Sequence, residues 1–188
     1  MSARLFDGDT FEHHGRTFRV RFEHDSDHEA PWDDGDGRGI VSDWTTRDKA
    51  PGERVLHSDE RSRRYFDFAG TVAKALAEGW DTAPYKQGTA GERAARAAEQ
   101  EYEYLRLWCA DQWEYVGVTV EQLNSDGEPI REDSLWGVET YKDYHREVAY
   151  EMAADLIAEE KHERKLKAKE TRERNYWAAR GVETRSQP

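Results

Sequence analysis

The chain has 188 residues, of which 36% are charged and 36% are hydrophobic, and its net charge is −12. Seven Trp, nine Tyr and six Phe supply large apolar rings, which argues against a disordered chain and fits one small domain with an appendage. The single Cys109 excludes an internal disulfide and a cysteine metal site, and no apolar run approaches the roughly 18 residues of a membrane-spanning helix. No signal-peptide pattern is evident, so we expect a cytoplasmic protein.

The first half of the chain predicts mainly β-structure followed by one helix. The expected elements are a hairpin over residues 10–13 and 16–24, a loop over 25–39, short strands over 40–45 and 63–66, and a helix over 68–78. Phe18, Val20 and Phe22 alternate with charged residues, as in a strand with one buried face. Asp67 is placed to cap the helix and Gly79 to end it.

The second half predicts a helix, a second hairpin and a long final helix. We expect them over residues 90–112, 113–138 and 140 to beyond 170, respectively. Thr89 and Glu92 form a capping box in front of the first of these helices, and residues 124–127 have the composition of a hairpin turn. Beyond Glu160 the apolar stripe of the last helix nearly vanishes, so its final part should be solvated.

These elements predict an α+β fold in which antiparallel β-hairpins pack with helices and a long helix ends the chain. We expect an α+β domain over residues 1–160, with halves at about 1–80 and 89–160, and a projecting basic helix with a loose tail over 161–188. Residues 92–160 contain 18 acids and 6 bases, whereas residues 161–188 contain 4 acids and 9 bases. The second half of the chain is therefore strongly dipolar.

Carboxylates recur every four residues along the final helix, where they should form one ridge. The candidate docking residues are Asp143, Glu147, Glu151, Asp155 and Glu159, joined by Glu99 and Glu103 from the preceding helix. Like charges at this spacing destabilise a helix by about 0.2–0.5 kcal/mol per pair, so the row is unusual for an ordinary surface. The ridge rotates by roughly 40° per step, which makes it by itself a poor copy of a DNA strand. Both a docking surface for a basic partner and a merely solvated surface remain open.

A second acidic cluster lies in the predicted loop after the first hairpin. Its members are Asp25, Asp27, Glu29, Asp33, Asp34 and Asp36. The first acids match the start of a calcium loop, but Ala30 stands where the sharp turn requires Gly. His24 and His28 lie beside these acids, yet they span a strand end and a loop, and there is no HExxH motif. A solvated or partner-binding loop is the simpler interpretation, and we expect no metal or other cofactor.

A third cluster combines basic and aromatic residues. It comprises Arg47, Lys49, Arg54, Arg61, Arg63 and Arg64, interleaved with Trp44, Tyr65 and Phe66. Bases and aromatic rings together can bind phosphates and stack on nucleobases. The same bases can instead pair with acids nearby in the sequence, so direct binding of nucleic acid is the weaker alternative.

Several aromatic segments resemble those of an uncharacterised family of bacteriophage and prophage proteins. They are residues 30–33 (APWD), 41–49 (VSDWTTRDK), 51–56 (PGERVL), 104–105 (YL), 108–109 (WC), 111–113 (DQW) and 134–137 (SLWG). The resemblance covers about residues 10–155 and transfers no catalytic residue. It implies a mobile-element context, in which small acidic proteins often antagonise host defence systems such as CRISPR or restriction.

The leading hypothesis is a non-enzymatic phage-encoded protein whose acidic surface docks on a basic, nucleic-acid-binding protein in the host cytoplasm. An accessory protein that binds nucleic acid through the Arg-rich stretch and basic tail is the alternative, and a metal-dependent hydrolase is a third. We expect no membrane contact. The basic segment 161–188 could also bind the acidic block 92–160 of a second copy, with Tyr176 and Trp177 as anchors.

Overall fold

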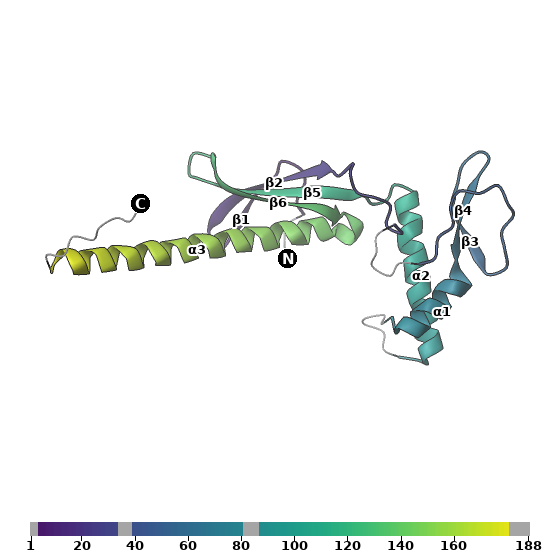
Figure 1. The fold of residues 1–188 in the computed structure, drawn as a ribbon. Helices are drawn as coiled ribbons and strands as arrows, with labels where there is room; N and C mark the ends of the chain where they lie inside the picture. Colours follow the sequence, from purple (N-terminus) through teal and green to yellow (C-terminus); the bar gives the residue numbers. More distant parts are fainter. Residues whose placement is uncertain (1–3, 34–38, 81–86, 181–188) are drawn as a thin grey trace, which may run out of the picture. The chain divides into compact units, whose positions relative to one another are not determined.

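The computed structural model describes residues 4–33, 39–80 and 87–180, and the chain forms two compact units (Figure 1). Unit 1 comprises Met1–His24 and Val116–Pro188, and unit 2 comprises Asp25–Tyr115. Unit 2 is therefore an insertion between two segments of unit 1. This division differs from the expected halves, because the strands that close unit 1 lie far apart in the sequence.

Unit 1 contains a four-stranded sheet and one long helix. Its elements are β1 (Thr10–His13), β2 (Arg16–His24), β5 (Tyr115–Leu123), β6 (Pro129–Glu139), a 3₁₀ turn (Tyr141–Asp143) and α3 (Tyr144–Ala178). The spatial order of the strands is β1-β2-β5-β6. β2 pairs in antiparallel register with β1 and with β5, where Val20 lies opposite Val120 and Phe22 opposite Val118. The two predicted hairpins and the long helix are confirmed.

One face of this sheet and α3 enclose the core of unit 1. The buried residues are Leu5, Phe11, Phe18, Val20, Val116, Val118, Val120 and Val138, with Val148, Ala149, Met152, Ala153, Leu156 and Ile157 from α3. Figure 1 shows α3 running along the sheet. Val138 reaches this face because Gly137, with a φ of 73°, interrupts the alternation of β6. Without that interruption Val138 would share the outer face with Ser134, whose hydroxyl lies 3.0 Å from that of Thr119.

The start of α3 is later than predicted. Lys142 and Asp143 have positive φ angles of 53° and 66°, so the chain turns before the helix begins at Tyr144. Arg146 holds this turn. Its guanidinium hydrogen-bonds the Asp143 carboxylate, and its Nε donates to the carbonyl oxygen of Leu5 (2.7 Å).

Unit 2 contains a β-hairpin and two helices. These are β3 (Glu53–Ser58), β4 (Arg63–Asp67), α1 (Phe68–Glu78) and α2 (Ala90–Cys109). β3 and β4 pair antiparallel, with an irregularity between Val55 and His57. The sequence did not predict β3, and the strand expected over residues 40–45 is reduced to isolated bridges that Val41 and Thr45 make with β4.

The helix caps of unit 2 are the predicted residues. The Asp67 carboxylate accepts a hydrogen bond from the Gly70 amide (2.8 Å), and Gly79 ends α1 with a φ of 68°. Thr89 and Glu92 make both hydrogen bonds of the capping box. α1 and α2 therefore begin where the local sequence signals place them.

Aromatic rings fill much of the core of unit 2. Tyr65 and Phe66 of β4 are fully buried, and Trp113 stacks on Tyr104 with ring centroids 4.4 Å apart. The indole Nε1 of Trp113 donates to the Tyr104 carbonyl oxygen (2.9 Å). Cys109 is half-buried, and burial raises the pKa of its thiol to about 11, so the thiol is protonated and unreactive near neutral pH.

The two units confirm the predicted α+β class, with antiparallel sheets and a long C-terminal helix. Residues 161–178 continue α3, and all of them except the half-buried Glu163 are exposed, in line with the loss of the apolar stripe. Residues 181–188, the expected loose tail, lie outside the described residues. Within the described ranges, no helix is long and apolar enough to cross a bilayer.

Candidate functional site

Four carboxylates form an exposed row on α3, here called the α3 ridge: Glu147, Glu151, Asp155 and Glu159. The buried stripe Val148, Met152 and Leu156 has the same four-residue spacing. Because both rows rotate about the helix axis at the same rate, the ridge stays on the side away from the sheet. None of the four makes an ion pair with a residue that the structure describes.

Arginines hold Asp143, the first acid of the predicted row, and Glu163, which lies one four-residue step beyond its last acid, Glu159. Asp143 lies in the turn before α3, where Arg146 hydrogen-bonds it and Arg4 lies 4.0 Å away. Glu163 accepts two hydrogen bonds from Arg131 of β6 (3.0 and 2.6 Å). These hydrogen bonds lower the pKa of Glu163, as expected for a carboxylate bound to a guanidinium. Asp143 therefore lies outside the helix and is not part of the α3 ridge.

The predicted docking set also included Glu99 and Glu103, which the structure places on α2 in unit 2. Glu99 accepts a hydrogen bond from Arg54 (2.7 Å), and this bond lowers the pKa of Glu99. Glu103 pairs with Arg106 (2.8 Å). Both acids thus have arginine partners within unit 2, whereas the α3 ridge belongs to unit 1.

Acids on the sheet and beside the ridge are paired as well. Glu121 is only 4% exposed on the outer face of the sheet, where Arg19 (2.6 Å) and Arg21 (2.9 Å) donate to its carboxylate. Glu160, the residue after the ridge, accepts a hydrogen bond from Arg16 (3.0 Å), which lowers its pKa. The α3 ridge differs from these sites because its carboxylates are exposed and no arginine in the described part of the chain hydrogen-bonds them.

The acidic loop is only partly covered by the structure. Asp25, Asp27, Glu29 and Asp33 are described, whereas Asp34 and Asp36 lie outside the described ranges. The Asp25 carboxylate accepts a hydrogen bond from the Asp27 amide (3.1 Å), which makes a local turn. His28 stacks on Tyr115 with ring centroids 3.7 Å apart. Over residues 4–33, 39–80 and 87–180, no group of three or more His, Cys, Asp or Glu side chains is arranged to hold a metal ion.

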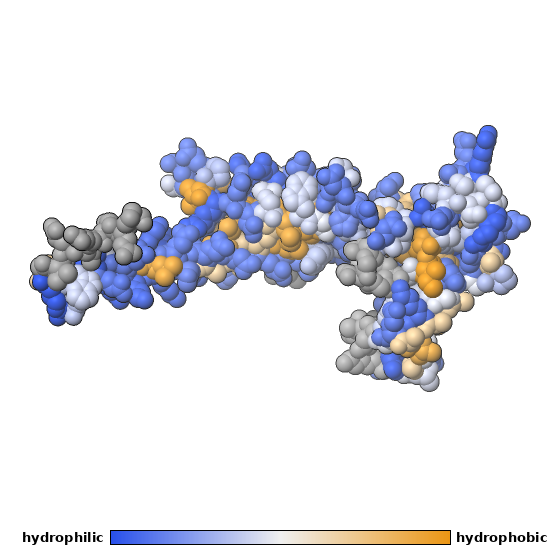
Figure 2. All heavy atoms as spheres, in the orientation of Figure 1, coloured by the Kyte–Doolittle hydropathy of each residue, from blue (hydrophilic) through white to orange (hydrophobic). Residues whose placement is uncertain are grey.

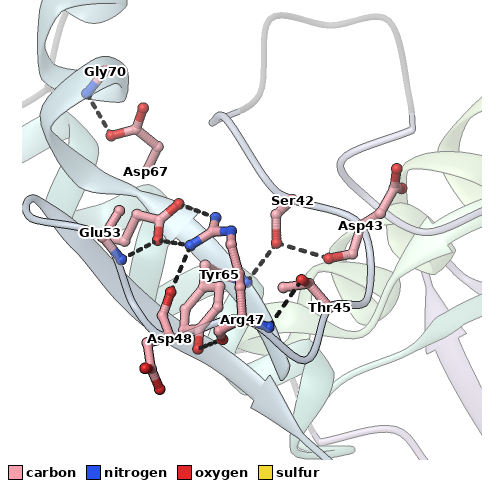
Figure 3. A network of polar contacts seen from close by, with 10 residues as sticks. Ser42, Asp43, Thr45, Arg47, Asp48, Glu53, Tyr65, Asp67 and Gly70 are labelled. Carbon is pink, nitrogen blue, oxygen red and sulfur yellow. Dashed lines mark hydrogen bonds and ion pairs between the residues drawn. The ribbon is translucent and has the colours of Figure 1, made fainter. Parts of the chain in front are cut away.

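Arg47, the first base of the Arg-rich stretch, is the centre of a polar network (Figure 3). Its guanidinium donates hydrogen bonds to both carboxylate oxygens of Glu53 (2.7 and 2.5 Å) and lies 4.8 Å from the centre of the Tyr65 ring. The Tyr65 hydroxyl donates in turn to the Arg47 carbonyl oxygen (2.9 Å). The hydrogen bonds from Arg47 lower the pKa of Glu53 to about 2, so both partners are charged near neutral pH.

Two further bases of this stretch are also engaged in unit 2. Arg54 pairs with Glu99, and Arg64 lies over the rings of Trp32 and Trp44, 4.6 and 5.5 Å from their centres. The remaining bases are exposed: Lys49, Arg61 and Arg63. Half of the predicted set therefore makes contacts within the fold, which weakens the nucleic-acid interpretation of this stretch.

The chain matches no protein-family model, no curated protein and no solved structure. The α3 ridge presents a row of exposed carboxylates, and such a row attracts basic groups. That electrostatic attraction is what the described residues are best arranged to provide.

Proposed function

We propose that this protein is a non-enzymatic binding protein whose α3 ridge docks on the basic, nucleic-acid-binding surface of a partner protein. The supporting observation is the contrast within unit 1. Glu121, Glu160 and Glu163 are held by arginines, whereas the α3 ridge has no such partner among the described residues. An exposed charge without an internal partner is available to an external one.

The geometry of the α3 ridge suits a basic groove. Its carboxylates are about 6 Å apart along the helix axis and turn by roughly 40° per step. Three steps therefore extend over about 18 Å and turn through about a third of the helix circumference. A groove that holds a nucleic-acid backbone presents Lys and Arg on more than one wall, so it can contact a ridge that turns. We infer that the protein competes with nucleic acid for such a groove.

The resemblance to bacteriophage proteins supplies the proposed biological setting. In that setting the partner is a host protein, and the proposed target is a basic effector of a defence system such as CRISPR or restriction. Occupying its nucleic-acid surface would inhibit the defence without a catalytic step.

The test compares tagged wild-type protein with Glu147→Lys/Glu151→Lys/Asp155→Lys in pull-downs from host lysate, followed by titration with the purified prey. We expect the triple variant to lose the partner. Wild-type binding should weaken sharply as salt is added, because exposed charges are already screened over about 8 Å at physiological ionic strength. Wild-type protein, but not the variant, should displace a labelled oligonucleotide from the same prey.

The matched control is Glu23→Lys/Asp126→Lys/Glu132→Lys, which changes the net charge of unit 1 equally at exposed positions outside α3. This control should keep most of the binding. Circular dichroism checks that both triple variants remain folded, since neither changes a core residue. Binding that survives the ridge reversal, or that is lost equally in the control, contradicts the proposal.

A further inference from the structure

α3 carries a second charged surface on its exposed side, here called the basic stripe: Lys165, Lys169 and Arg172. These three bases are exposed and make no ion pair with a described residue. At about 100° per residue they fall within roughly 60° of one another around the helix axis. Figure 2 shows that this C-terminal part of α3 is predominantly hydrophilic.

Glu147 and Glu151 of the α3 ridge point in nearly the same direction as the basic stripe. Glu151 and Lys169 are 18 residues apart, which corresponds to about five full turns, and Glu147 and Arg172 are 25 residues apart, about seven turns. These two carboxylates and the basic stripe face away from the residues of α3 that are buried against the sheet. Glu151 and Lys169 cannot meet within one helix, because about 27 Å of helix axis separates them.

An antiparallel second copy of α3 brings these opposite charges together. Suppose that two antiparallel copies of α3 cross at residue 160 of each. A residue that lies n positions before residue 160 in one copy then faces the residue that lies n positions after residue 160 in the other copy. This register places two acids opposite two bases, Glu151 with Lys169 and Asp155 with Lys165. Glu147 lies opposite Glu173, with Arg172 beside it. The two-fold symmetry of such a pair repeats each contact, so four attractive contacts form across one interface.

Two exposed tyrosines fit the same register independently of charge. Tyr144 and Tyr176 are 48% and 51% exposed and lie at opposite ends of α3. They are equally far from residue 160, so antiparallel pairing sets each ring against the other. Ala158 is exposed near the crossing point, where a small side chain allows the helix axes to approach to about 8–10 Å.

We propose that α3 pairs antiparallel with α3 of a second copy, so that the α3 ridge of each chain contacts the basic stripe of the other. The charge pattern and the tyrosine positions support the same register. This dimer uses carboxylates that are also assigned to the partner protein, so a basic partner has to displace the second copy. The inference does not rest on the proposed function.

The first test is sedimentation analysis of the full chain and of two charge-reversal variants, Glu147→Lys/Glu151→Lys and Lys169→Glu/Arg172→Glu. The wild type should be dimeric, and each variant alone should be monomeric because its two surfaces then repel. An equimolar mixture of the variants should form heterodimers, since every reversed residue then faces an opposite charge. A monomeric wild type, or a mixture that stays monomeric while both variants keep their helical circular dichroism, overturns the proposal.

The second test determines the orientation of the helices by disulfide formation. Glu151→Cys/Lys169→Cys should form an intermolecular disulfide under mild oxidation. Glu151→Cys alone should not, because its two copies lie about 27 Å apart along the antiparallel pair. Ready crosslinking of the single variant would indicate a parallel pair and overturn the register. The wild-type protein measures the background crosslinking through Cys109. This background should be low, because burial raises the pKa of the Cys109 thiol to about 11.

Lys169→Glu/Arg172→Glu also separates this inference from the proposed function, because it leaves the α3 ridge unchanged. If both proposals hold, this variant is monomeric and binds the basic partner at least as tightly as the wild type. A wild-type dimer for which the ridge reversal changes no partner binding overturns the proposed function and supports the dimer. Ridge-dependent partner binding by a monomeric wild type overturns only the dimer.

Discussion

At the scale of single residues, pairing with arginine determines which carboxylates are available. Glu53, Glu99, Glu121, Glu160 and Glu163 are each bonded to an arginine. Some of these pairs, such as Arg16 with Glu160, join residues that are far apart in the sequence, so residue spacing could not predict them. The exposure of the α3 ridge was predictable, because it depends only on which sides of a single helix the acidic and apolar residues occupy.

Glu53 gives a pH-dependent contribution to stability whose sign follows from its pKa. The hydrogen bonds from Arg47 lower that pKa from 4.5 to about 2. A carboxylate with a lowered folded-state pKa stabilises the fold above its unfolded-state pKa, and the contribution is lost as the pH falls from about 4.5 toward 2. We expect Glu53→Gln to lower the free energy of unfolding near neutral pH, measured by urea denaturation, and the difference from the wild type to shrink in acid.

The control for this measurement is Glu60→Gln, at an exposed position beside the same hairpin. Its free energy of unfolding should stay close to that of the wild type at every pH. A destabilisation of Glu53→Gln that is constant from neutral pH to about pH 2 would contradict the ion-pair explanation.

At the scale of elements, the capping box of α2 makes a separate prediction. Thr89→Ala removes the side-chain oxygen that accepts from the Glu92 amide, and the loss of such a cap costs about 1 kcal/mol. We expect the free energy of unfolding to fall by about this amount in urea denaturation. Thr89→Ser keeps the hydroxyl and should behave like the wild type. Equal losses in both variants would mean that the threonine methyl group, and not the cap, stabilises the helix.

Elements with strong local signals were predictable, and those without them were not. α1 and α2 begin at capping residues, and β2 alternates regularly between apolar and charged side chains. β3 was missed because Val55 is exposed beside the buried Leu56 and the pairing shifts there, which breaks the regular alternation of a strand. Residues 40–45 were predicted as a strand, but within this described segment the pairing is limited to two isolated bridges.

At the scale of the whole molecule, the pairing of β2 with β5 organises the chain. His24 lies opposite Val116 in that pair, so the chain leaves and re-enters unit 1 at adjacent positions. The alternation of apolar and polar residues within a few positions cannot specify that β2 pairs with β5, because all of unit 2 separates these strands in the sequence. This is why the expected halves, 1–80 and 89–160, differ from the units.

These adjacent positions predict that unit 1 folds without unit 2. Replacing residues 25–115 by Asn-Gly would connect β2 to β5 through a two-residue hairpin turn. We expect the shortened chain to keep an α+β circular dichroism spectrum and to unfold cooperatively, because the core of unit 1 comes from its own two segments. Leu156→Ala should destabilise the shortened and full-length chains alike, by about 2–5 kcal/mol. A shortened chain without a cooperative transition would contradict this prediction.

The insertion also sets an order of events during synthesis on the ribosome. β1 and β2 are made before the rest of unit 1. Phe18 packs on Phe11 within this hairpin, but it and Val20 acquire their other core neighbours only after β5 and the first turns of α3 have been translated. At about 5–20 residues per second, that interval is on the order of ten seconds. Unit 2 is contiguous in the chain and can fold during this time. The nascent protein is therefore expected to fold from its middle outward, with an apolar hairpin that a ribosome-associated chaperone would shield until the final helix arrives.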